Sequence, residues 1–286
     1  MKRKGLIKDM LRTSVTVELQ GGLGNQLFGW AAGFVLSQKL GCDLIVDKRN
    51  LNQRGYQLDH FSFGKDLKTS DKQVTGIRGI KNKIYGNIFE EKSFEYDPRF
   101  ENIVSPKALR GYFQSWKYHT GFENEIYAQV RGLILESLQL QALENKYPFE
   151  DLIGVHVRRG DYKALEQYHG TIKSDYYKTA IETIESVGKT SSKFIVFSDE
   201  PEEAKTVLPG AVAYIGPSEL PSPAENMVLM SRCRALIGAN SSFSLWAGLI
   251  MKPDSKMRIF PKPWFSEKSI SDKDLVPQHF IRLQNS

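Results

Sequence analysis

The first half of the chain opens with the patterns of a strand, a turn and a helix. Residues 14–19 alternate polar and β-branched positions, which is typical of a strand, and a glycine-rich turn follows at residues 20–24. Residues 25–40 then carry apolar side chains at helical spacing, and residues 44–46 begin a second strand. This order predicts a β-loop-α-β unit. Residues 50–107 are polar and irregular, and they predict only loops and short elements.

The rest of the chain alternates apolar strands with amphipathic helices. An aromatic stretch at residues 111–118 and a helix over residues 124–143 come first. The patterns then predict strands at residues 152–157, 193–197, 212–215, 235–238 and 257–260, and helices at residues 175–187, 201–208, 224–234 and 241–251. Such alternation indicates a parallel, doubly wound sheet. Two halves of this kind predict an α/β protein with two Rossmann-like domains facing a cleft, residues 1–147 and 148–286.

The composition is that of a globular protein with its own core. The chain has 286 residues, of which 41% are hydrophobic and 25% charged. Its two cysteines, Cys42 and Cys233, lie too far apart in the sequence to indicate a disulfide scaffold. The apolar stretches are too interrupted for a membrane span, and the basic N-terminus lacks the apolar core of a signal peptide. We therefore expect a cytoplasmic protein.

The charge balance is basic, with a net charge of +6. Such a balance suits an anionic partner: a nucleic acid, an anionic membrane face or a phosphorylated substrate. Lysines and arginines are spread along the chain, without a basic tail or a nucleic-acid motif, so we expect no nucleic-acid partner. A phosphorylated substrate and peripheral docking on an anionic inner membrane both remain open. The sequence leaves the oligomeric state open as well.

The strongest candidate for chemistry is the run His156-Val157-Arg158-Arg159-Gly160-Asp161-Tyr162, which follows a predicted buried strand. Ligands of open α/β sheets bind at the carboxyl ends of the strands. Guanidinium groups placed there can bind a phosphate through two hydrogen bonds and can stabilise a diphosphate leaving group. The alternative is a surface arginine pair in an ion pair with Asp161. The residues alone favour neither interpretation.

Three weaker signals also follow predicted strands. The turn that contains Gly22 and Gly24 could bring backbone N–H groups close to an anion or a sugar, but a tight turn with close helix packing explains it as well. Asn25 and Gln26 could recognise hydroxyl groups or cap the helix. The second signal is at Asn240, Ser241 and Ser242, at the start of a later predicted helix, where these residues could bind a phosphate or cap the helix. The third is Asp199, which could bind a nucleoside or cap the helix that follows it.

The sequence gives little support for a metal site. The five histidines are scattered, and none has a cysteine at metal-ligand spacing. Asp272 and Asp274 form an Asp-x-Asp pattern, but they lie in a polar C-terminal stretch that we interpret as a solvated loop. Positive side chains would then have to offset the charge of a diphosphate.

Taken together, the motifs resemble a known family, the bacterial α-1,2-fucosyltransferases of glycosyltransferase family 11. The resemblance covers residues 14–265. It rests on an ordered set of motifs: G-G-L-G-N-Q-L-F at residues 21–28, G-Y-F-Q-S at 111–115, H-V-R-R-G-D-Y at 156–162, H-G at 169–170 with D-Y-Y at 175–177, F-S-D at 197–199, L-M-S-x-C at 229–233 and A-N-S-S-F-S at 239–244.

The resemblance implies a GT-B-like fold and an inverting, metal-independent transfer of L-fucose. The donor would be GDP-fucose, no further cofactor would be needed, and the acceptor would be the 2-hydroxyl of a terminal galactoside in glycan or O-antigen synthesis. Arg158 would hold the β-phosphate, and Arg159, His156 and Asp161 would order the pocket. Asp199 would face the guanosine, Ser241 and Ser242 the diphosphate, and Asn25 the transferred sugar. The same resemblance assigns Gly22, Gly24 and Asn226 to the donor site.

The chain departs from the family pattern at several positions. Asn226 stands where members often carry Asp, and Cys233-Arg234-Ala235 replaces the common Cys-Lys-His. The usual S-F-S-W-W-G-A becomes S-F-S-L-W-A-G at residues 242–248. These changes leave the donor chemistry in place and bear on the nucleoside contact at Asn226 and on the acceptor preference; the aromatic and tryptophan changes can equally be neutral packing exchanges.

The resemblance implies a single in-line displacement by an acceptor hydroxyl, with an oxocarbenium-like transition state. His156 and Asp161 are the candidate bases. Two other functions remain: a fucosyltransferase of another linkage, and a glycan- or nucleotide-binding module without catalysis.

Overall fold

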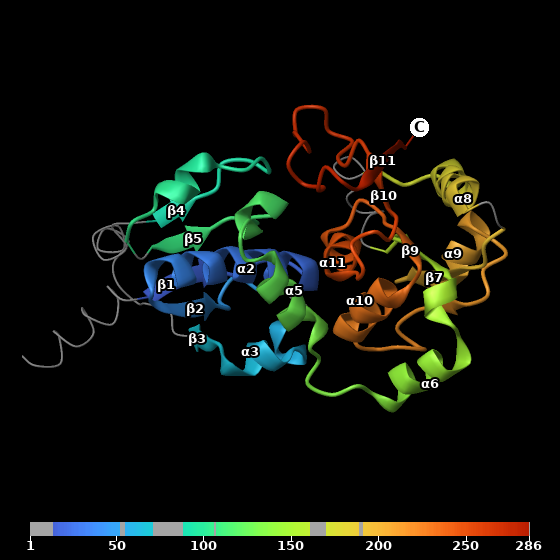
Figure 1. Ribbon diagram of the computed structural model, residues 1–286. Coiled ribbons are helices and arrows are strands. Elements are labelled where there is room, and N and C mark those ends of the chain that lie inside the picture. Colours follow the sequence, from blue (N-terminus) through green and yellow to red (C-terminus); the bar gives the residue numbers. More distant parts are fainter. Residues whose placement is uncertain are drawn as a thin grey trace, which may run out of the picture. The chain divides into compact units, whose positions relative to one another are not determined.

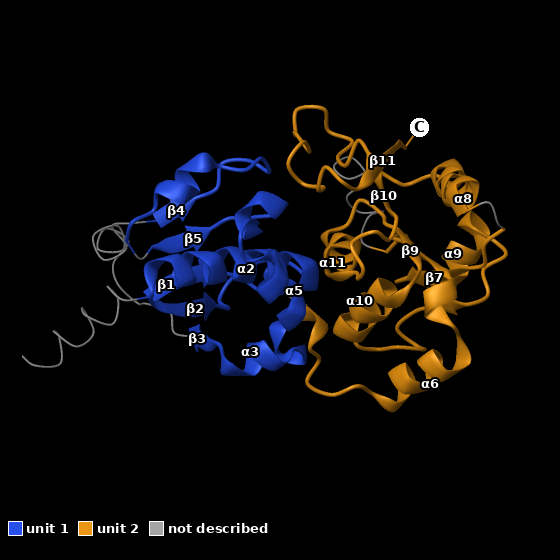
Figure 2. Ribbon diagram, viewed as in Figure 1, with its two compact units in different colours: residues 1–129 blue, residues 130–286 orange. Residues whose placement is uncertain are grey.

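The computed structural model describes residues 14–51, 55–70, 88–105, 107–160, 170–188 and 191–285. The chain divides into two compact units, Met1–Gln129 and Val130–Ser286, which Figure 2 colours separately. Each unit is built around one parallel sheet, so the predicted α/β class with two doubly wound halves is confirmed.

The sheet of the first unit has five strands in the order β3-β2-β1-β5-β4 (Figure 1). The strands are β1 Ser14–Glu18, β2 Asp43–Asp47, β3 Lys68–Ser70, β4 Ile88–Glu90 and β5 Ala108–Arg110, and every pairing is parallel. β1 and β2 confirm the predicted strands. β3 and β4 lie in the segment predicted to hold only short elements, and each has three residues.

Helix α2 (Leu23–Leu40) connects β1 to β2 and confirms the predicted helix. It ends at Gly41, whose φ of 61° lies in the left-handed region that glycine adopts without strain. A Cβ on Gly33 would lie 2.8 Å from Leu44 Cδ1, so a glycine lets the helix approach the sheet closely. The first unit also contains α3 (Ser62–Asp66), most of α5 (Glu123–Arg131) and short 3-10 segments at Leu58–His60, Pro98–Asn102 and Trp116–His119.

The sheet of the second unit has six strands in the order β11-β10-β9-β6-β7-β8, again all parallel. They are β6 Ile153–Val157, β7 Phe194–Ser198, β8 Tyr214–Ile215, β9 Ala235–Ile237, β10 Arg258–Lys262 and β11 Ile281–Gln284. The helices are α6 Leu138–Lys146, α8 Ser174–Gly188, α9 Pro201–Val207, α10 Pro223–Arg232 and α11 Ser242–Ile250. Among the six strands of this sheet, β11 alone was not predicted.

The single helix predicted over residues 124–143 is wrong. The chain forms two helices there, α5 and α6, because Gly132 follows the end of α5 and Ser137 begins a new helix by accepting the N–H of Leu140. Ser137 also donates from its backbone N–H and its hydroxyl to Glu225 of α10, at 2.6 and 2.9 Å. Residues 130–147, which we assigned to the first domain, thus belong to the second compact unit, and the functional division into two domains stays a prediction.

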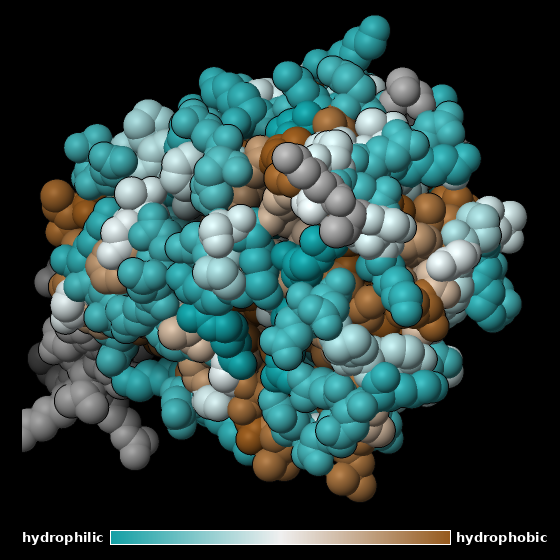
Figure 3. Space-filling view, turned by 45° about the vertical axis from the view of Figure 1, so that its right-hand side comes forward, coloured by the Kyte–Doolittle hydropathy of each residue, from teal (hydrophilic) through white to brown (hydrophobic). Residues whose placement is uncertain are grey.

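No helix in the described ranges is long and apolar enough to cross a bilayer. Hydrophilic residues cover most of the face seen in Figure 3, and apolar residues appear there in small groups.

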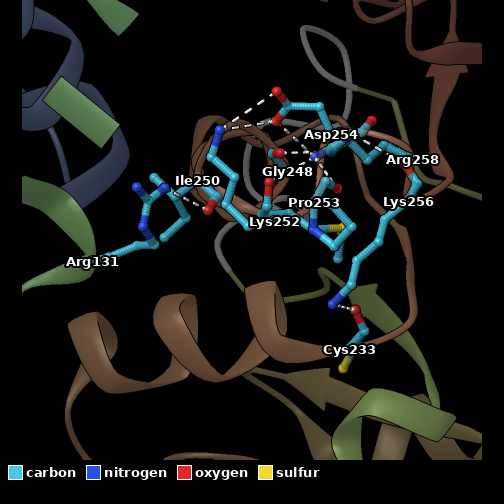
Figure 4. A network of polar contacts seen from close by, with 10 residues as sticks. Arg131, Cys233, Gly248, Ile250, Lys252, Pro253, Asp254, Lys256 and Arg258 are labelled. Atoms are coloured by element: carbon cyan, nitrogen blue, oxygen red, sulfur yellow. Dashed lines mark hydrogen bonds and ion pairs between the residues drawn. The ribbon is translucent and has the colours of Figure 1, made fainter. Parts of the chain in front are cut away.

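A buried arginine closes the end of α11 (Figure 4). Arg258 is 4% exposed, and its guanidinium donates to the carbonyls of Gly248 at 2.9 Å, Met251 at 2.7 Å and Asp254 at 2.6 Å, with further bonds to Lys256 and Pro253. The last carbonyls of a helix have no partner within the helix. One side chain therefore satisfies the end of α11 and the loop that leads into β10.

We expect Arg258→Ala to lower the free energy of unfolding by about 3 kcal/mol or more, since several buried carbonyls lose their donor. Lys252→Ala is the matched control from the same loop. Lys252 lies 3.2 Å from Asp254, but both side chains are exposed, so its loss should cost less than about 0.5 kcal/mol. Denaturant unfolding measures both changes, and equal effects would contradict this assignment.

Candidate functional site

The predicted arginine motif lies at the carboxyl edge of the second sheet. β6, β7 and β9 are neighbours in that sheet, and each leads into a predicted site segment: Arg158 to Gly160, Asp199, and Asn240 to Ser242. Because parallel strands end at the same edge, segments far apart in the sequence come together there. Asp161 lies outside the described residues, so its part in the motif stays a prediction.

Asp199 holds the arginine turn in place. Its Oδ1 accepts the N–H of Arg159 at 3.0 Å, its Oδ2 accepts the N–H of Gly160 at 3.1 Å, and Arg158 Nε lies 3.3 Å from Oδ2. A Cβ on Gly160 would lie 2.7 Å from Asp199 Oδ2, which explains the glycine. The carboxylate beside Arg158 therefore comes from the next strand, and the guanosine contact predicted for Asp199 stays a prediction.

The two arginines differ in their surroundings. Arg159 is buried, donates to the carbonyl of Ile172 at 3.0 Å and lies 3.8 Å from Glu203. Arg158 is the more exposed of the pair, with 17% of its side chain accessible against 10% for Arg159. Arg159 thus anchors the turn inside the unit, and Arg158 is the better placed of the two to meet a ligand.

His156 is the fourth residue of β6 and is 3% exposed. Its ring lies 5.6 Å from that of Phe243, and its Nδ1 has no hydrogen-bond partner among the described residues. Burial, and after it the charge of Arg158, lower the pKa of His156 well below its usual value. The imidazole is therefore neutral at pH 7 and is a weak base.

The start of α11 completes this edge. Ser241 caps the helix by accepting the N–H of Phe243 at 3.3 Å, and Ser242 is the first helical residue. The Asn240 amide donates to the carbonyl of Trp264 at 3.1 Å. First-turn N–H groups that a helix does not use internally favour an anion. The capping role of Ser241 is thus present, and contacts of Ser241 and Ser242 with a diphosphate stay predictions.

The side chain of Asn226 is used within the start of α10. The Asn226 amide donates to the carbonyls of Leu220 at 2.6 Å and Ser222 at 3.0 Å, so it stabilises the start of its own helix. Its contact with a nucleotide stays a prediction.

The solvated loop predicted around Asp272 and Asp274 is wrong: Asp274 is 6% exposed, and Asp272 accepts the N–H of Trp264. The unpredicted strand β11 holds this segment, because its Arg282 also pairs with Asp272.

In the first unit, the glycine turn after β1 is closely packed. Gly21 has a φ of +64°, and a Cβ there would lie 2.5 Å from Asn25 Nδ2, so only glycine fits. Gln26 is fully buried and uses its whole amide: Nε2 donates to the carbonyls of Gly21 at 3.0 Å and Gly55 at 2.9 Å, and Oε1 accepts the N–H of Gln57 at 3.0 Å. Gln26 therefore ties two loops together. Gly22 precedes α2 and Gly24 lies in its first turn, and their ligand contacts stay predictions.

Asn25 is linked to the loop after the neighbouring strand. Its Oδ1 accepts a hydrogen bond from Gln114 Nε2 at 2.9 Å, and Gln114 belongs to the G-Y-F-Q-S motif that follows β5. The order β1-β5-β4 puts these loops side by side at the carboxyl edge of the first sheet.

Glu91 is a residue of this edge that the sequence did not reveal. It directly follows β4, and its Oε2 accepts the N–H groups of Tyr112 and Phe113, each at 2.8 Å. Burial raises the pKa of Glu91 to about 7, although the N–H groups of Phe113 and Tyr112 oppose this. It was missed because it lies in a polar run with no clear strand pattern.

In the described residues, no three histidine, cysteine, aspartate or glutamate side chains gather in a group that could hold a metal ion. The prediction that the activity needs no metal stays a prediction.

The architecture has a counterpart among solved structures. POFUT1 in complex with GDP-fucose matches with a TM-score of 0.50 at 12% identity, over 87% of this chain and 98% of that one. With its two parallel α/β sheets, the chain has the GT-B-like fold of glycosyltransferases. The chain belongs to glycosyl transferase family 11, whose sequence pattern matches residues 2–276. The resemblance drawn from the motifs is confirmed.

Curated relatives agree with this family. The O-antigen biosynthesis glycosyltransferase WbnK of Escherichia coli is 28% identical over 87% of this chain and 94% of that protein. An alpha-1,2-colitosyltransferase of Escherichia coli is 28% identical over 94% of this chain and 99% of that protein. The galactoside 2-alpha-L-fucosyltransferase Sec1 of Mus musculus is 27% identical over 84% of this chain and 65% of that protein. This chain is thus a glycosyltransferase of the fucosyl- and colitosyltransferase type.

The buried carboxyl group of Glu91 predicts a pH-dependent stability. Its pKa is about 7 in the fold and about 4.5 in the unfolded chain, so the folded protein holds an extra proton between these values. The stability from this group is fully present below pH 4.5 and is lost as the pH rises through about 7. Glu91→Gln stays neutral, so its stability relative to wild type should rise over that window, by on the order of 2 to 3 kcal/mol.

Unfolding of wild type and Glu91→Gln by urea at several values between pH 4.5 and 8 measures this difference. Glu90→Gln, at the exposed neighbouring position, is the control and should follow wild type. Parallel pH curves for wild type and Glu91→Gln would contradict the raised pKa.

Proposed function

We propose that this protein transfers L-fucose from GDP-fucose to the 2-hydroxyl of a terminal galactoside, with inversion and without a metal ion. The observation that carries the proposal is the turn after β6, where Asp199 fixes Arg158 beside the start of α11. Two independent sources of positive potential, a guanidinium and a helix N-terminus, meet at one sheet edge there.

This edge suits the diphosphate of a nucleotide sugar. As the glycosidic bond breaks, negative charge grows on the leaving phosphate, and a cation already held in place stabilises that charge without reorganisation. Arg159 has its hydrogen bond inside the unit, so Arg158 is the residue we assign to the leaving group. The first turn of α11, with Ser241 and Ser242, supplies N–H donors to the same group.

The acceptor side is assigned to the first unit. Asn25 is half-buried at the carboxyl edge of its sheet, and Gln114 orients its amide. The names of two relatives, an alpha-1,2-colitosyltransferase and a galactoside 2-alpha-L-fucosyltransferase, share transfer to a 2-hydroxyl and support that linkage.

The chemistry would be a single displacement in which the acceptor oxygen attacks as the bond to GDP breaks. The lowered pKa of His156 makes it a poor base, and its burial suits ordering of the Arg158 turn instead. Asp161 remains the other candidate base from the motif. We also keep the expectations of a cytoplasmic location and of peripheral docking on an anionic membrane as parts of this proposal.

The direct test is release of GDP from GDP-fucose in the presence of lactose or N-acetyllactosamine and excess EDTA. We expect release that depends on the acceptor and survives EDTA, with an α-1,2 linkage in the product. Loss of activity in EDTA, with recovery on adding a divalent cation, would refute the metal-independent mechanism.

Other outcomes of the same assay separate the alternatives. Activity with a nucleotide-linked colitose in place of GDP-fucose would change the donor sugar, as the name of one relative suggests. A different linkage in the product would indicate another fucosyltransferase, and GDP binding without turnover on any acceptor would indicate a binding module.

Changes at the arginine turn should weaken the donor site. We expect Asp199→Ala to lower GDP affinity at least about tenfold, because the N–H groups of the turn lose their charged acceptor and Arg158 loses its ion-pair partner. Arg158→Lys should reduce kcat by a similar factor or more, since an ammonium cannot reproduce a bidentate contact. Calorimetry and initial rates measure these effects. Glu203→Ala, 3.8 Å from Arg159, is the control and should change GDP affinity less than about twofold; unchanged GDP affinity in Asp199→Ala would refute the role of the turn.

A further inference from the structure

Glu91 occupies a position that is costly for a carboxyl group. It is half-buried, the Tyr118 hydroxyl and Asp97 lie close to it, and its Oε1 has no hydrogen-bond partner of regular geometry among the described residues. No lysine or arginine in the described ranges forms an ion pair with it. Burying a charge without a cation is unfavourable, and the raised pKa reflects this. Because the buried charge of Glu91 is unfavourable for folding, we expect this residue to have a functional role.

What Glu91 holds is a turn in an unfavourable conformation. Gly111 has a φ of 151°, and Phe113 has a φ of 52°, a left-handed conformation that is rare for a bulky residue. In the described part of the chain, Phe113 is the only residue other than glycine with positive φ. Such a conformation persists where its surroundings enforce it. Here Oε2 of Glu91 accepts the two consecutive N–H groups of Tyr112 and Phe113.

The fit between the carboxyl group and the turn is close. A Cβ on Gly111 would lie 2.5 Å from Glu91 Cβ and 2.8 Å from its Oε2. The backbone N–H of Glu91 also donates to the carbonyl of Arg110 at 2.9 Å, which continues the pairing of β4 with β5. Both the main chain and the side chain of Glu91 therefore fix where β5 ends and how the turn leaves it.

Through Gln114, the turn is connected to Asn25, the residue predicted to lie near the transferred sugar. Gln114 follows Phe113, is 8% exposed, and donates to Asn25 Oδ1 at 2.9 Å. A second, longer contact links Gln20 Nε2 to the carbonyl of Gly111 at 3.4 Å. Two hydrogen bonds thus link the loop after β1 to the loop after β5, and Glu91 holds the second loop.

We propose that Glu91 is a positioning residue for the transfer reaction, which fixes the turn at residues 111–113 so that Gln114 holds the amide of Asn25 in its productive orientation. This proposal rests on the proposed function. Glu91 acts through Gln114 and does not itself contact substrate. A displacement of about 1 Å at a reacting group can lower a rate about a hundredfold, so a change at Glu91 should appear in turnover.

The choice of variants separates position from charge. Glu91→Asp keeps the charge but withdraws the oxygen from the turn by the length of one carbon–carbon bond, and should lower kcat roughly 10- to 100-fold. Glu91→Gln removes the charge but keeps an oxygen in reach of both N–H groups, and should stay within about threefold of wild type. Glu90→Asp, the same change at the exposed neighbouring residue, should have no effect. Affinity for GDP, which the proposed function assigns to the second unit, should be unchanged in all three, and the binding stoichiometry reports the folded fraction.

A double-mutant cycle tests the route through Asn25. If Glu91 acts by placing Asn25, then Glu91→Asp should cost less than about twofold in kcat once Asn25→Ala is present, because interacting residues are not additive. Equal losses in both backgrounds, unchanged kcat in Glu91→Asp, or equal losses in Glu91→Asp and Glu91→Gln would each overturn the proposal. A wild-type protein that binds GDP but transfers no fucose would instead refute the proposed function, and this outcome does not depend on the kcat ratios of the variants.

Discussion

Parallel strand pairing is the constraint on which both units depend. All strands of a parallel sheet end at one edge, and the chain that leaves each strand loses the regular hydrogen bonds of the sheet. Its N–H groups then need other partners, because buried polar groups without partners are costly. In this protein the partners come from the residue that follows a neighbouring strand. The same requirement that stabilises the edge therefore also shapes the candidate site.

Both sheets meet this requirement with a carboxylate. Asp199, one residue after β7, accepts two consecutive N–H groups of the turn that follows β6. Glu91, one residue after β4, accepts two consecutive N–H groups of the turn that follows β5. In each case a site residue sits on or next to the turn that is held: Arg158 in the second unit, and Gln114 with its partner Asn25 in the first. Each turn is thus fixed by a residue distant in the sequence.

This arrangement explains which features could be predicted from the sequence. The strands β6 and β7 are apolar runs, β1 alternates polar and β-branched residues, and helix α2 has apolar side chains at helical spacing. The motif at residues 156–160 begins in the last two residues of β6. β3 and β4 have only three residues each, which is too short for a periodic signal. Glu91 lies in the run Glu-Glu-Lys-Ser, which indicates an exposed loop, and its partners lie 21 and 22 residues away. Only the pairing of β4 with β5 brings them together. Asp272 was misjudged for the same reason, because β11 was not recognised.

The two carboxylates differ in what lies beside them, and this difference has a physical consequence. Asp199 has the guanidinium of Arg158 at 3.3 Å, so its charge is compensated by an ion pair. Glu91 has no such cation among the described residues, and burial raises its pKa to about 7. The second unit thus holds an ion pair at this edge. The first unit keeps a fixed geometry, because Oε2 can accept both N–H groups whether or not the other oxygen carries a proton. Under the proposed function, a nucleotide sugar needs compensation of charge and an acceptor hydroxyl needs orientation, and the two turns would meet these separate requirements.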